Sequence, residues 1–220
     1  MTRLAIFDCD GTLVDSQATI CDAMEHCFAG AGLPAPDRAA VRRIVGLSLP
    51  QAMRALLPDA GEAEHHALAE AYKASFHALR LAGRVQENLY DGIPEVLARL
   101  EAEGWLLGVA TGKSDRGLKL VLDHHGLAHR FVTLQTADRH PSKPNPAMIE
   151  AAMAEAGAAR GDTVMIGDTS FDIAMARHAG VRAIGVAWGY HEAAELLAEG
   201  ADAVAATPAD LPALCVRETV

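Results

Sequence analysis

Short, almost wholly apolar segments recur along the chain, and stretches with a helical spacing of apolar residues separate them. The apolar segments are residues 4–7, 106–110, 131–134, 164–166 and 183–186. Strands of a parallel sheet that are covered on both faces have such continuous apolar runs. The helical stretches are residues 93–103, 114–125, 146–156 and 171–179, and a glycine closely follows each. This alternation predicts an α/β fold with a Rossmann-like open parallel sheet.

One connection is too long for this pattern. No strand is predicted between Phe7 and Leu106, whereas a simple strand–helix–strand unit needs about thirty residues. Residues 16–29, 37–44, 50–57 and 62–81 have helical patterns instead. We therefore predict an inserted α-helical cap domain over residues 16–82 and a catalytic core domain formed by residues 1–15 and 83–220. The hinges are expected near Asp15–Ser16 and between Gly83 and Gly92.

Composition and charge exclude several classes of protein. The chain has 19 Lys and Arg against 29 Asp and Glu, a net charge of -10, and no run of basic residues that would hold a nucleic-acid backbone. No apolar stretch approaches the roughly 18 residues of a membrane span, and no basic, apolar leader begins the chain. The four cysteines lack zinc-binding spacing. We expect a cytoplasmic protein with reduced thiols that binds neither nucleic acid nor membrane.

Acidic side chains follow two of the predicted strands. Asp8 and Asp10 come directly after the first, and Asp168 and Asp172 come after the fourth. Ligands of open α/β sheets bind at the carboxyl ends of the strands, so these carboxylates are expected in one cleft. Like charges this close destabilise a site unless cations compensate. Lys143 would supply one positive charge, and a hard divalent cation, most plausibly Mg²⁺, the rest.

The segment Thr111-Gly112-Lys113-Ser114 lies between a predicted strand and a predicted helix. Free backbone N–H groups and the helix dipole bind anions at such a position. The segment resembles the end of a nucleotide-binding P-loop, but Leu107 stands where the motif requires its first glycine. It is therefore better suited to holding a single phosphoryl group.

Four motifs in order make the chain similar to the haloacid dehalogenase-like superfamily, and within it to the phosphoglycolate-phosphatase-like group with a helical cap. They are Asp8-Cys9-Asp10-Gly11-Thr12, Thr111, Lys143 in Ser-Lys-Pro, and Gly167 to Asp172. The similarity extends over essentially the whole chain. It implies a Mg²⁺-dependent phosphatase that hydrolyses small phosphorylated metabolites, with 2-phosphoglycolate the leading substrate.

The resemblance also implies a role for each motif residue. Asp8 would be the nucleophile that forms an aspartyl-phosphate, and Asp10 would act first as general acid and then as general base. Mg²⁺ would be bound by Asp8, the backbone carbonyl of Asp10 and Asp168. Asp172 would orient Lys143 or a metal-bound water. The residues expected to bind the phosphate are Thr111, Gly112 and Lys143.

The predicted cap contains no residue that can be assigned singly. Gly46 to Leu49 look like the cap loop that contacts substrate in this family. The pair His65-His66 is expected on a helix surface. Six basic side chains could bind an anion, although a solvated helix face is the simpler explanation for each: Arg42, Arg43, Lys73, His77, Arg80 and Arg84.

Alternative functions remain at this stage. A sugar-phosphate mutase of the β-phosphoglucomutase type belongs to the same family, but Leu49 stands where such mutases have an arginine. A signalling receiver domain would be near 120 residues and would lack the insertion. A non-catalytic regulatory protein that binds phosphate on the same fold is the remaining alternative. Either a monomer or a homodimer is compatible with the sequence.

Overall fold

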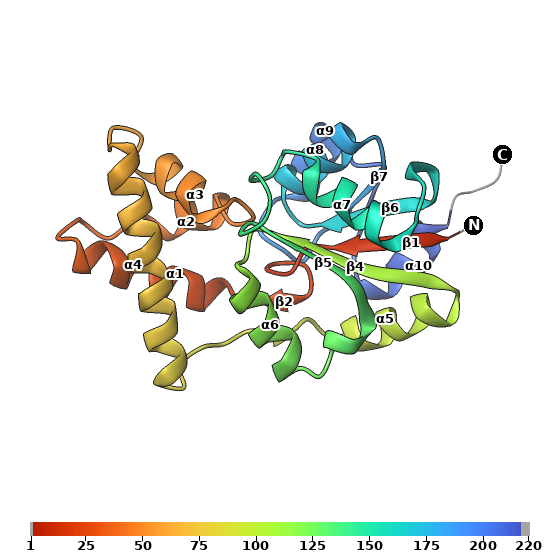
Figure 1. Cartoon of the computed structure of the whole chain (residues 1–220), viewed down its shortest axis with the longest axis horizontal. Coiled ribbons are helices and arrows are strands. Elements are labelled where there is room, and N and C mark those ends of the chain that lie inside the picture. The colour runs from red at the N-terminus through yellow and green to blue at the C-terminus, as the bar shows by residue number, and fades with distance from the viewer. Residues whose placement is uncertain (1, 217–220) are drawn as a thin grey trace.

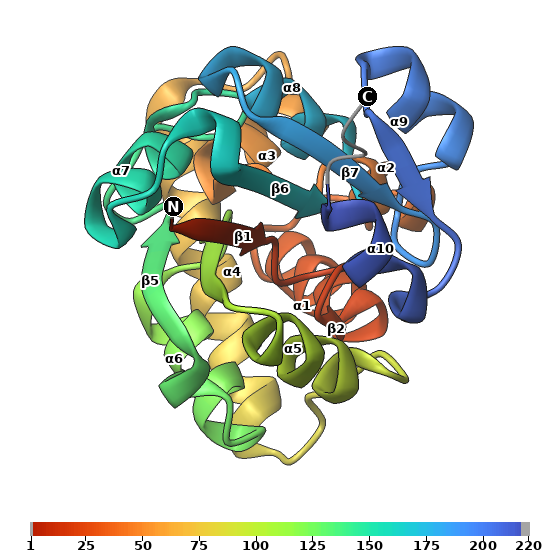
Figure 2. The same ribbon diagram turned by 90° about the vertical axis from the view of Figure 1, so that its right-hand side faces the viewer.

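The computed structural model describes residues 2–216, and its centre is a six-stranded parallel sheet (Figures 1 and 2). The strand order is β5-β4-β1-β6-β7-β8. The strands are β1 (Arg3–Phe7), β4 (Trp105–Thr111), β5 (Phe131–Thr136), β6 (Thr163–Gly167), β7 (Arg182–Val186) and β8 (Ala203–Ala205). The predicted α/β fold with an open parallel sheet is confirmed. The five predicted strands match β1 and β4 to β7, whereas the alanine-rich β8 was not predicted.

Helices cover both faces of this sheet (Figure 2). The helices on one face are α5 (Ile93–Ala102), α6 (Asp115–His124) and α10 (Leu211–Cys215). Those on the other face are α7 (Ala147–Ala156), α8 (Ser170–Ala179) and α9 (Ala193–Glu199). Ala5 and Phe7 of β1 pack in the first layer, and Leu4 and Ile6 pack in the second. Burial on both faces explains why the strand sequences are continuously apolar.

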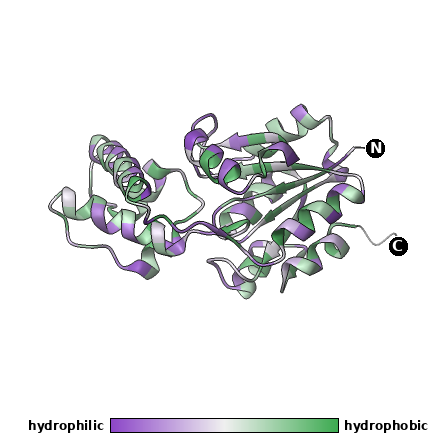
Figure 3. Cartoon of the chain, turned by 90° about the horizontal axis from the view of Figure 1, so that it is seen from below, coloured by the Kyte–Doolittle hydropathy of each residue, from purple (hydrophilic) through white to green (hydrophobic). Residues whose placement is uncertain are grey.

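Four further helices form a separate group at the end of the molecule opposite both termini (Figure 1). They are α1 (Gln17–Gly30), α2 (Arg38–Arg43), α3 (Leu49–Leu56) and α4 (Glu62–Leu81). Their apolar faces meet in a core of their own, in which Met24 and Met53 are almost fully buried. Hydrophilic and hydrophobic residues alternate along these helices (Figure 3), as in amphipathic helices that pack around a core. We call this group, residues 17–81, the helical cap.

Two short strands connect the cap to the sheet domain. β2 (Val14–Asp15) and β3 (Asn88–Leu89) pair in antiparallel register, with Val14 opposite Leu89. The expectation that no strand lies between Phe7 and Leu106 was therefore wrong, because two-residue strands are too short to show a periodic pattern. We propose that this ribbon forms the boundary between a core of residues 1–15 and 83–220 and a cap domain of residues 16–82.

Three other sequence features can be compared with the structure. No helix within residues 2–216 combines the length and the apolar character needed to cross a membrane. All four cysteines are buried and unpaired. His65, which was expected on the surface, is buried, and its Nε2 lies 2.8 Å from the carbonyl oxygen of Leu57. That expectation was wrong because α4 turns the histidine toward the loop that follows α3.

Candidate active site

Three neighbouring strand ends bring the predicted residues together. β1 lies between β4 and β6, so Asp8 has Thr111 on one side and Asp168 on the other. The order of strands also reverses here, because β4 and β5 extend the sheet on one side of β1, whereas β6, β7 and β8 extend it on the other. Such a position at the carboxyl ends of the strands is the usual ligand site of an open α/β sheet.

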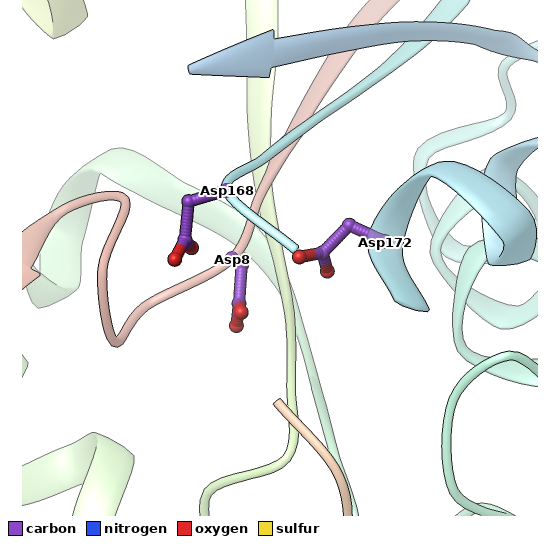
Figure 4. A group of neighbouring side chains, drawn as sticks. All are labelled: Asp8, Asp168 and Asp172. Carbon is purple, nitrogen blue, oxygen red and sulfur yellow. The ribbon is translucent and has the colours of Figure 1, made fainter. Parts of the chain in front are cut away.

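Three buried carboxylates form the centre of the site (Figure 4). Asp8, Asp168 and Asp172 each place an oxygen within 4.8 Å of the others. Burial raises the pKa of Asp8 to about 7, although the nearby Lys143 acts in the opposite direction. Burial, and then the charges of Asp172 and Asp8, raise the pKa of Asp168 as well. Raised pKa values mean that the negative charges of these carboxylates are not fully neutralised by nearby positive groups of the protein.

Lys143 is the cation within this group. Its fully buried Nζ lies 2.6 Å from Oδ1 of Asp172 and 2.9 Å from Oδ2 of Asp8. Burial opposes the positive charge, but Asp172 and Asp8 more than offset this effect and raise the pKa of Lys143. One ammonium thus faces three carboxylates, which leaves room in the charge balance for a divalent cation.

The donor set suits a hard metal ion. Carboxylate oxygens are the ligands that Mg²⁺ prefers, and the structure presents them on two adjacent strand ends. Oδ2 of Asp8 is buried and accepts no well-directed hydrogen bond, although it pairs with Lys143. The residues present therefore fit a magnesium ion.

Asp168 is held by the loops around it. Oγ1 of Thr12 donates a hydrogen bond to its Oδ1 at 2.8 Å, and the backbone N–H of Tyr190 donates to its Oδ2 at 3.0 Å. Gly11 has a φ of 86°, and a Cβ on it would lie 2.1 Å from Oδ2 of Asp168. Glycine at this position of the first motif is thus required both by backbone conformation and by the close approach of the carboxylate.

Asp172 lies in the first turn of α8 and has partners for both of its oxygens. Its Oδ2 accepts hydrogen bonds from the backbone N–H and the Oγ1 of Thr169, at 3.1 and 2.7 Å, and so caps the helix. Its Oδ1 accepts one from Lys143. This arrangement fixes Lys143 beside Asp8.

Asp10 has a separate set of contacts. Oγ of Ser16 donates to its Oδ1 at 2.6 Å, and Nζ of Lys113 donates to Oδ1 and Oδ2 at 2.7 and 2.9 Å. Lys113 also lies 3.0 Å from Oε1 of Glu87, a buried residue in the segment that leads from the cap to β3. The hydroxyl of Tyr190 lies 3.1 Å from that of Ser16.

Sequence reasoning did not assign these four partners. Lys113 lies inside the segment Thr111 to Ser114, and Ser16 lies four residues after the first motif, so both positions were a usable signal. Glu87 and Tyr190 have no motif of their own. Only the fold shows that they reach the site.

A cavity of about 100 Å³ opens at the reactive side chains. The sheet domain contributes Asp8, Asp10, Thr111 and Gly112 to its lining, so the predicted residues of the first two motifs face one space. None of the six basic residues named above lines this cavity, although Lys73, His77 and Arg80 line a second groove.

The cap covers the cavity. A Cβ on Gly112 would lie 2.6 Å from the carbonyl oxygen of Gly46, which shows how closely the cap loop approaches the loop after β4. The backbone N–H of Ser48 donates to Oγ of Ser142 in the sheet domain at 2.8 Å. The expected cap loop thus lies against the predicted phosphate-binding loop.

Comparisons with known proteins agree with this geometry. The model of the haloacid dehalogenase-like hydrolase family matches residues 5–186. The chain is 38% identical over 201 residues to the probable phosphatase IndB of Dickeya dadantii, covering 90% of this chain and 86% of that protein. It is 29% identical over 192 residues to a phosphoglycolate phosphatase of Mesorhizobium japonicum, covering 85% and 83%.

Two further similarities extend the comparison. The chain is 33% identical over 192 residues to the tyrosine-protein kinase PtkA of Mycobacterium tuberculosis, covering 87% of this chain but only 64% of that protein's length. Among solved structures, a haloacid dehalogenase-like family hydrolase from Streptococcus pneumoniae superposes with a TM-score of 0.84 at 25% identity. That match covers 97% of this chain and 98% of the other.

Proposed function

Because this chain belongs to the haloacid dehalogenase-like hydrolase family as a phosphoric monoester hydrolase, we propose that it is a Mg²⁺-dependent phosphatase of small phosphorylated metabolites. The observation that carries the proposal is the single cavity lined by Asp8, Asp10 and Thr111, beside a buried group of carboxylates with one lysine. The leading substrate suggested by the family is 2-phosphoglycolate, the compound for which several relatives are named.

Asp8 is the proposed nucleophile. Its carboxylate faces the cavity, and an oxygen would attack phosphorus in line with the departing alkoxide to form an aspartyl-phosphate. The raised pKa of Asp8 reflects burial among like charges, so the anion needs compensation from nearby cations. Lys143 supplies part of that compensation at 2.9 Å.

Asp10 is the proposed general acid and base. It lies two residues after Asp8 and lines the same cavity. It would protonate the leaving oxygen in the first step, and the resulting carboxylate would then take a proton from the water that hydrolyses the aspartyl-phosphate. Ser16 and Lys113 hold its carboxylate in place.

The transferred phosphoryl group needs donors for the three oxygens that carry charge in the transition state. Thr111 and Gly112 line the cavity beside Asp8, and Nζ of Lys143 lies 2.9 Å from Oδ2 of Asp8. We assign these three residues to phosphate binding. Asp172 would act through Lys143, which it holds at 2.6 Å.

Mg²⁺ would be held by Asp8, Asp168 and the backbone carbonyl of Asp10. When bound, it would neutralise the charge that builds up between the carboxylate and the phosphate. The hydrogen bonds from Thr12 and Tyr190 orient Asp168 for this role. The buried, unpaired cysteines support a location in the reducing cytoplasm.

A phosphatase is favoured over a sugar-phosphate mutase. A phosphohexose presents several hydroxyl groups that must find hydrogen-bond partners when the cap closes. Leu49, at the position where mutases have an arginine, instead adds an apolar side chain to the cavity. No observation in the described structure supports the mutase reaction.

The test is release of inorganic phosphate from a panel of phosphomonoesters with Mg²⁺, repeated with a chelator and with the Asp8→Asn variant. We expect turnover that needs Mg²⁺ and that falls to background in the variant. Turnover that persists in Asp8→Asn would contradict the proposed nucleophile. A phosphohexose that yields isomerised product rather than phosphate would show a mutase.

A further inference from the structure

The side of the reactive cavity formed by the cap is entirely apolar. Every side chain that the cap contributes there is a hydrocarbon or a thioether, and the larger ones are Ile20, Met24, Ile44, Val45, Leu47 and Leu49. They come from α1, from the cap loop and from the start of α3. The part of a substrate that lies beyond the phosphoryl group therefore faces a surface that offers no side-chain hydrogen bond.

Lys113 is the one cationic side chain among the residues that line this cavity, and its charge is already matched. Its Nζ lies 2.7 Å from Asp10 and 3.0 Å from Glu87. Both carboxylates are nearly buried, and they more than offset the desolvation of the ammonium, so the pKa of Lys113 is raised. A substrate carboxylate would have to displace one of these partners to pair with Lys113.

The polar backbone groups of the cap loop do not offer a hydrogen-bond donor to a substrate anion either. The carbonyl oxygens of Gly46 and Leu47 face Gly112, and carbonyl groups repel an anion. The N–H of Ser48 is bonded to Ser142. Arg43 points away from the cavity, where it forms an exposed pair with Glu195 at 2.5 Å.

The size of the cavity limits the leaving group. Its volume of about 100 Å³ is small beside the roughly 300–1,000 Å³ of common ligand pockets. A small leaving group therefore suits the space beside the phosphoryl group with the cap in this position.

A larger groove of about 450 Å³ between α4 and α6 adjoins this cavity, and Lys113 and Ser114 line both. Two of its basic residues have carboxylate partners, whereas Arg116 and His77 contact each other, with Nη2 of Arg116 3.3 Å from Nδ1 of His77. Lys73 pairs with Glu70 at 2.8 Å, and Arg80 pairs with Glu87 at 2.5 Å. The ammonium of Lys113, held between two carboxylates, lies where the two spaces meet.

From this lining we propose that the substrate is a phosphomonoester whose leaving group is small, uncharged and apolar. The inference rests on the proposed phosphatase function, keeps its reaction, and departs from 2-phosphoglycolate, the substrate that the family suggests. A buried carboxylate without a partner is strongly disfavoured, whereas a branched alkyl group gains from contact with the cap residues. The cavity should therefore discriminate against 2-phosphoglycolate.

A matched pair of substrates tests this proposal. Isobutyl phosphate and 2-phosphoglycolate have leaving groups of the same branched shape, but two methyl groups of the first replace the carboxylate oxygens of the second. We expect kcat/KM for isobutyl phosphate to be higher by about tenfold or more. An equal value, or a preference for 2-phosphoglycolate, would overturn the proposal.

Two variants of Leu49 add a control at one position of the cavity. Leu49→Lys places a cation on the apolar side, and the ratio of the two kcat/KM values should shift toward 2-phosphoglycolate by about tenfold. Leu49→Met has similar length without the charge and should leave the ratio near that of the unmodified protein. A ratio that Leu49→Lys leaves unchanged would argue against the assigned role of this surface.

Binding to Asp8→Asn in the presence of Mg²⁺ separates the two proposals, because this variant should bind both compounds without turnover. Tighter binding of isobutyl phosphate in calorimetric titration supports the substrate class even if no phosphomonoester is hydrolysed by the unmodified protein. In that case the proposed phosphatase function fails alone. Tighter binding of 2-phosphoglycolate would overturn the substrate class while leaving the hydrolysis mechanism standing.

Discussion

Lys113 donates hydrogen bonds to both carboxylate oxygens of Asp10, with Nζ 2.7 Å from Oδ1 and 2.9 Å from Oδ2. The same ammonium lies 3.0 Å from Glu87, which belongs to the segment that leaves the cap. Asp10, the proposed acid and base of the reaction, is thus held by Lys113, and Lys113 is in turn held by a residue of the connection to the cap. The rate of a reaction that uses Asp10 should therefore depend on Lys113, although Lys113 makes and breaks no bond itself.

Lys113→Met tests this relationship. Without the ammonium, the Asp10 side chain keeps only Ser16 as a partner, and its misplacement should lower kcat by up to about 100-fold. KM should change less, because Lys113 is not assigned to phosphate binding. Lys119→Met, in the helix α6 that follows Lys113, changes an exposed lysine, is the matched control and should retain full activity. A kcat that stays normal in Lys113→Met would show that Asp10 does not depend on it.

The raised pKa of Asp8 predicts how stability depends on pH. Its ordinary value of 3.8 becomes about 7 in the folded protein, so the folded state holds a proton that the unfolded state loses across this interval. The contribution of Asp8 to stability is therefore greatest below pH 4 and declines as the pH rises toward 7.

Asp8→Asn removes that penalty. In metal-free protein the variant should melt at a higher temperature than the unmodified chain at pH 8, and the difference should shrink at pH 5. Scanning calorimetry at the two pH values measures this, with the exposed Asp123→Asn as control. A lower melting temperature for Asp8→Asn at pH 8 would mean that the ion pair with Lys143 dominates instead.

Magnesium binding should strengthen as the pH rises from 6 to 8. Protons compete with the metal for carboxylates, and the pKa values of Asp8 and Asp168 are both raised by burial and by nearby carboxylates. Titration calorimetry in two buffers of different ionisation enthalpy should show more proton release near pH 6 than at pH 8, because Asp8 has a pKa of about 7. A Kd that is independent of pH would place the metal elsewhere.

Lys143→Met should destabilise the protein more than any surface substitution. It leaves three buried carboxylates without their cation, a change that typically costs about 3–5 kcal/mol. Urea unfolding in the presence of chelator measures the loss, and saturating Mg²⁺ should restore part of it. The exposed Lys73→Met serves as control, with an expected change below about 1 kcal/mol.

Gly112→Ala tests the contact between the cap loop and the sheet domain. The added Cβ would lie 2.6 Å from the carbonyl oxygen of Gly46 and 2.7 Å from that of Leu47, so the cap loop must move away. We expect kcat/KM to fall by about tenfold or more and the N–H of Ser48 to exchange faster with deuterium. Gly161→Ala meets no atom within 4 Å and should change neither property.

The fold was predictable because its signals are local and repeated. Continuous apolar runs identified the five longer strands, and the rule that ligands bind at the carboxyl ends of the strands located Asp8 at the binding edge of the sheet. The strand order, with β1 between β4 and β6, came from the structure. β8 was missed because Ala203 and Ala205 carry little of the hydrophobic signal that longer side chains provide. β2 and β3 were missed because two residues cannot establish a period.

The site was predictable where a recognised motif supplied the residue, as for Lys143 and Asp172, or where a motif follows a strand end. Asp8, Thr111 and Asp168 lie on adjacent strands, and the structure places them together. Their chemical roles remain predictions. Glu87 could not be found from sequence, because its approach to Lys113 depends on how the cap returns to the sheet. The apolar lining of the cavity was equally hidden, since residues from three separate segments form it.

The pairing of β2 with β3 makes the two ends of the cap neighbours in space, although more than seventy residues separate them along the chain. An insertion whose ends lie side by side can be exchanged for another of different size without moving the strands that flank it. The cap surface that selects the leaving group can therefore change while the reacting carboxylates of the sheet domain stay the same. Cap exchange between relatives at Asp15 and Asn88 offers a route to new specificity on an unaltered catalytic core.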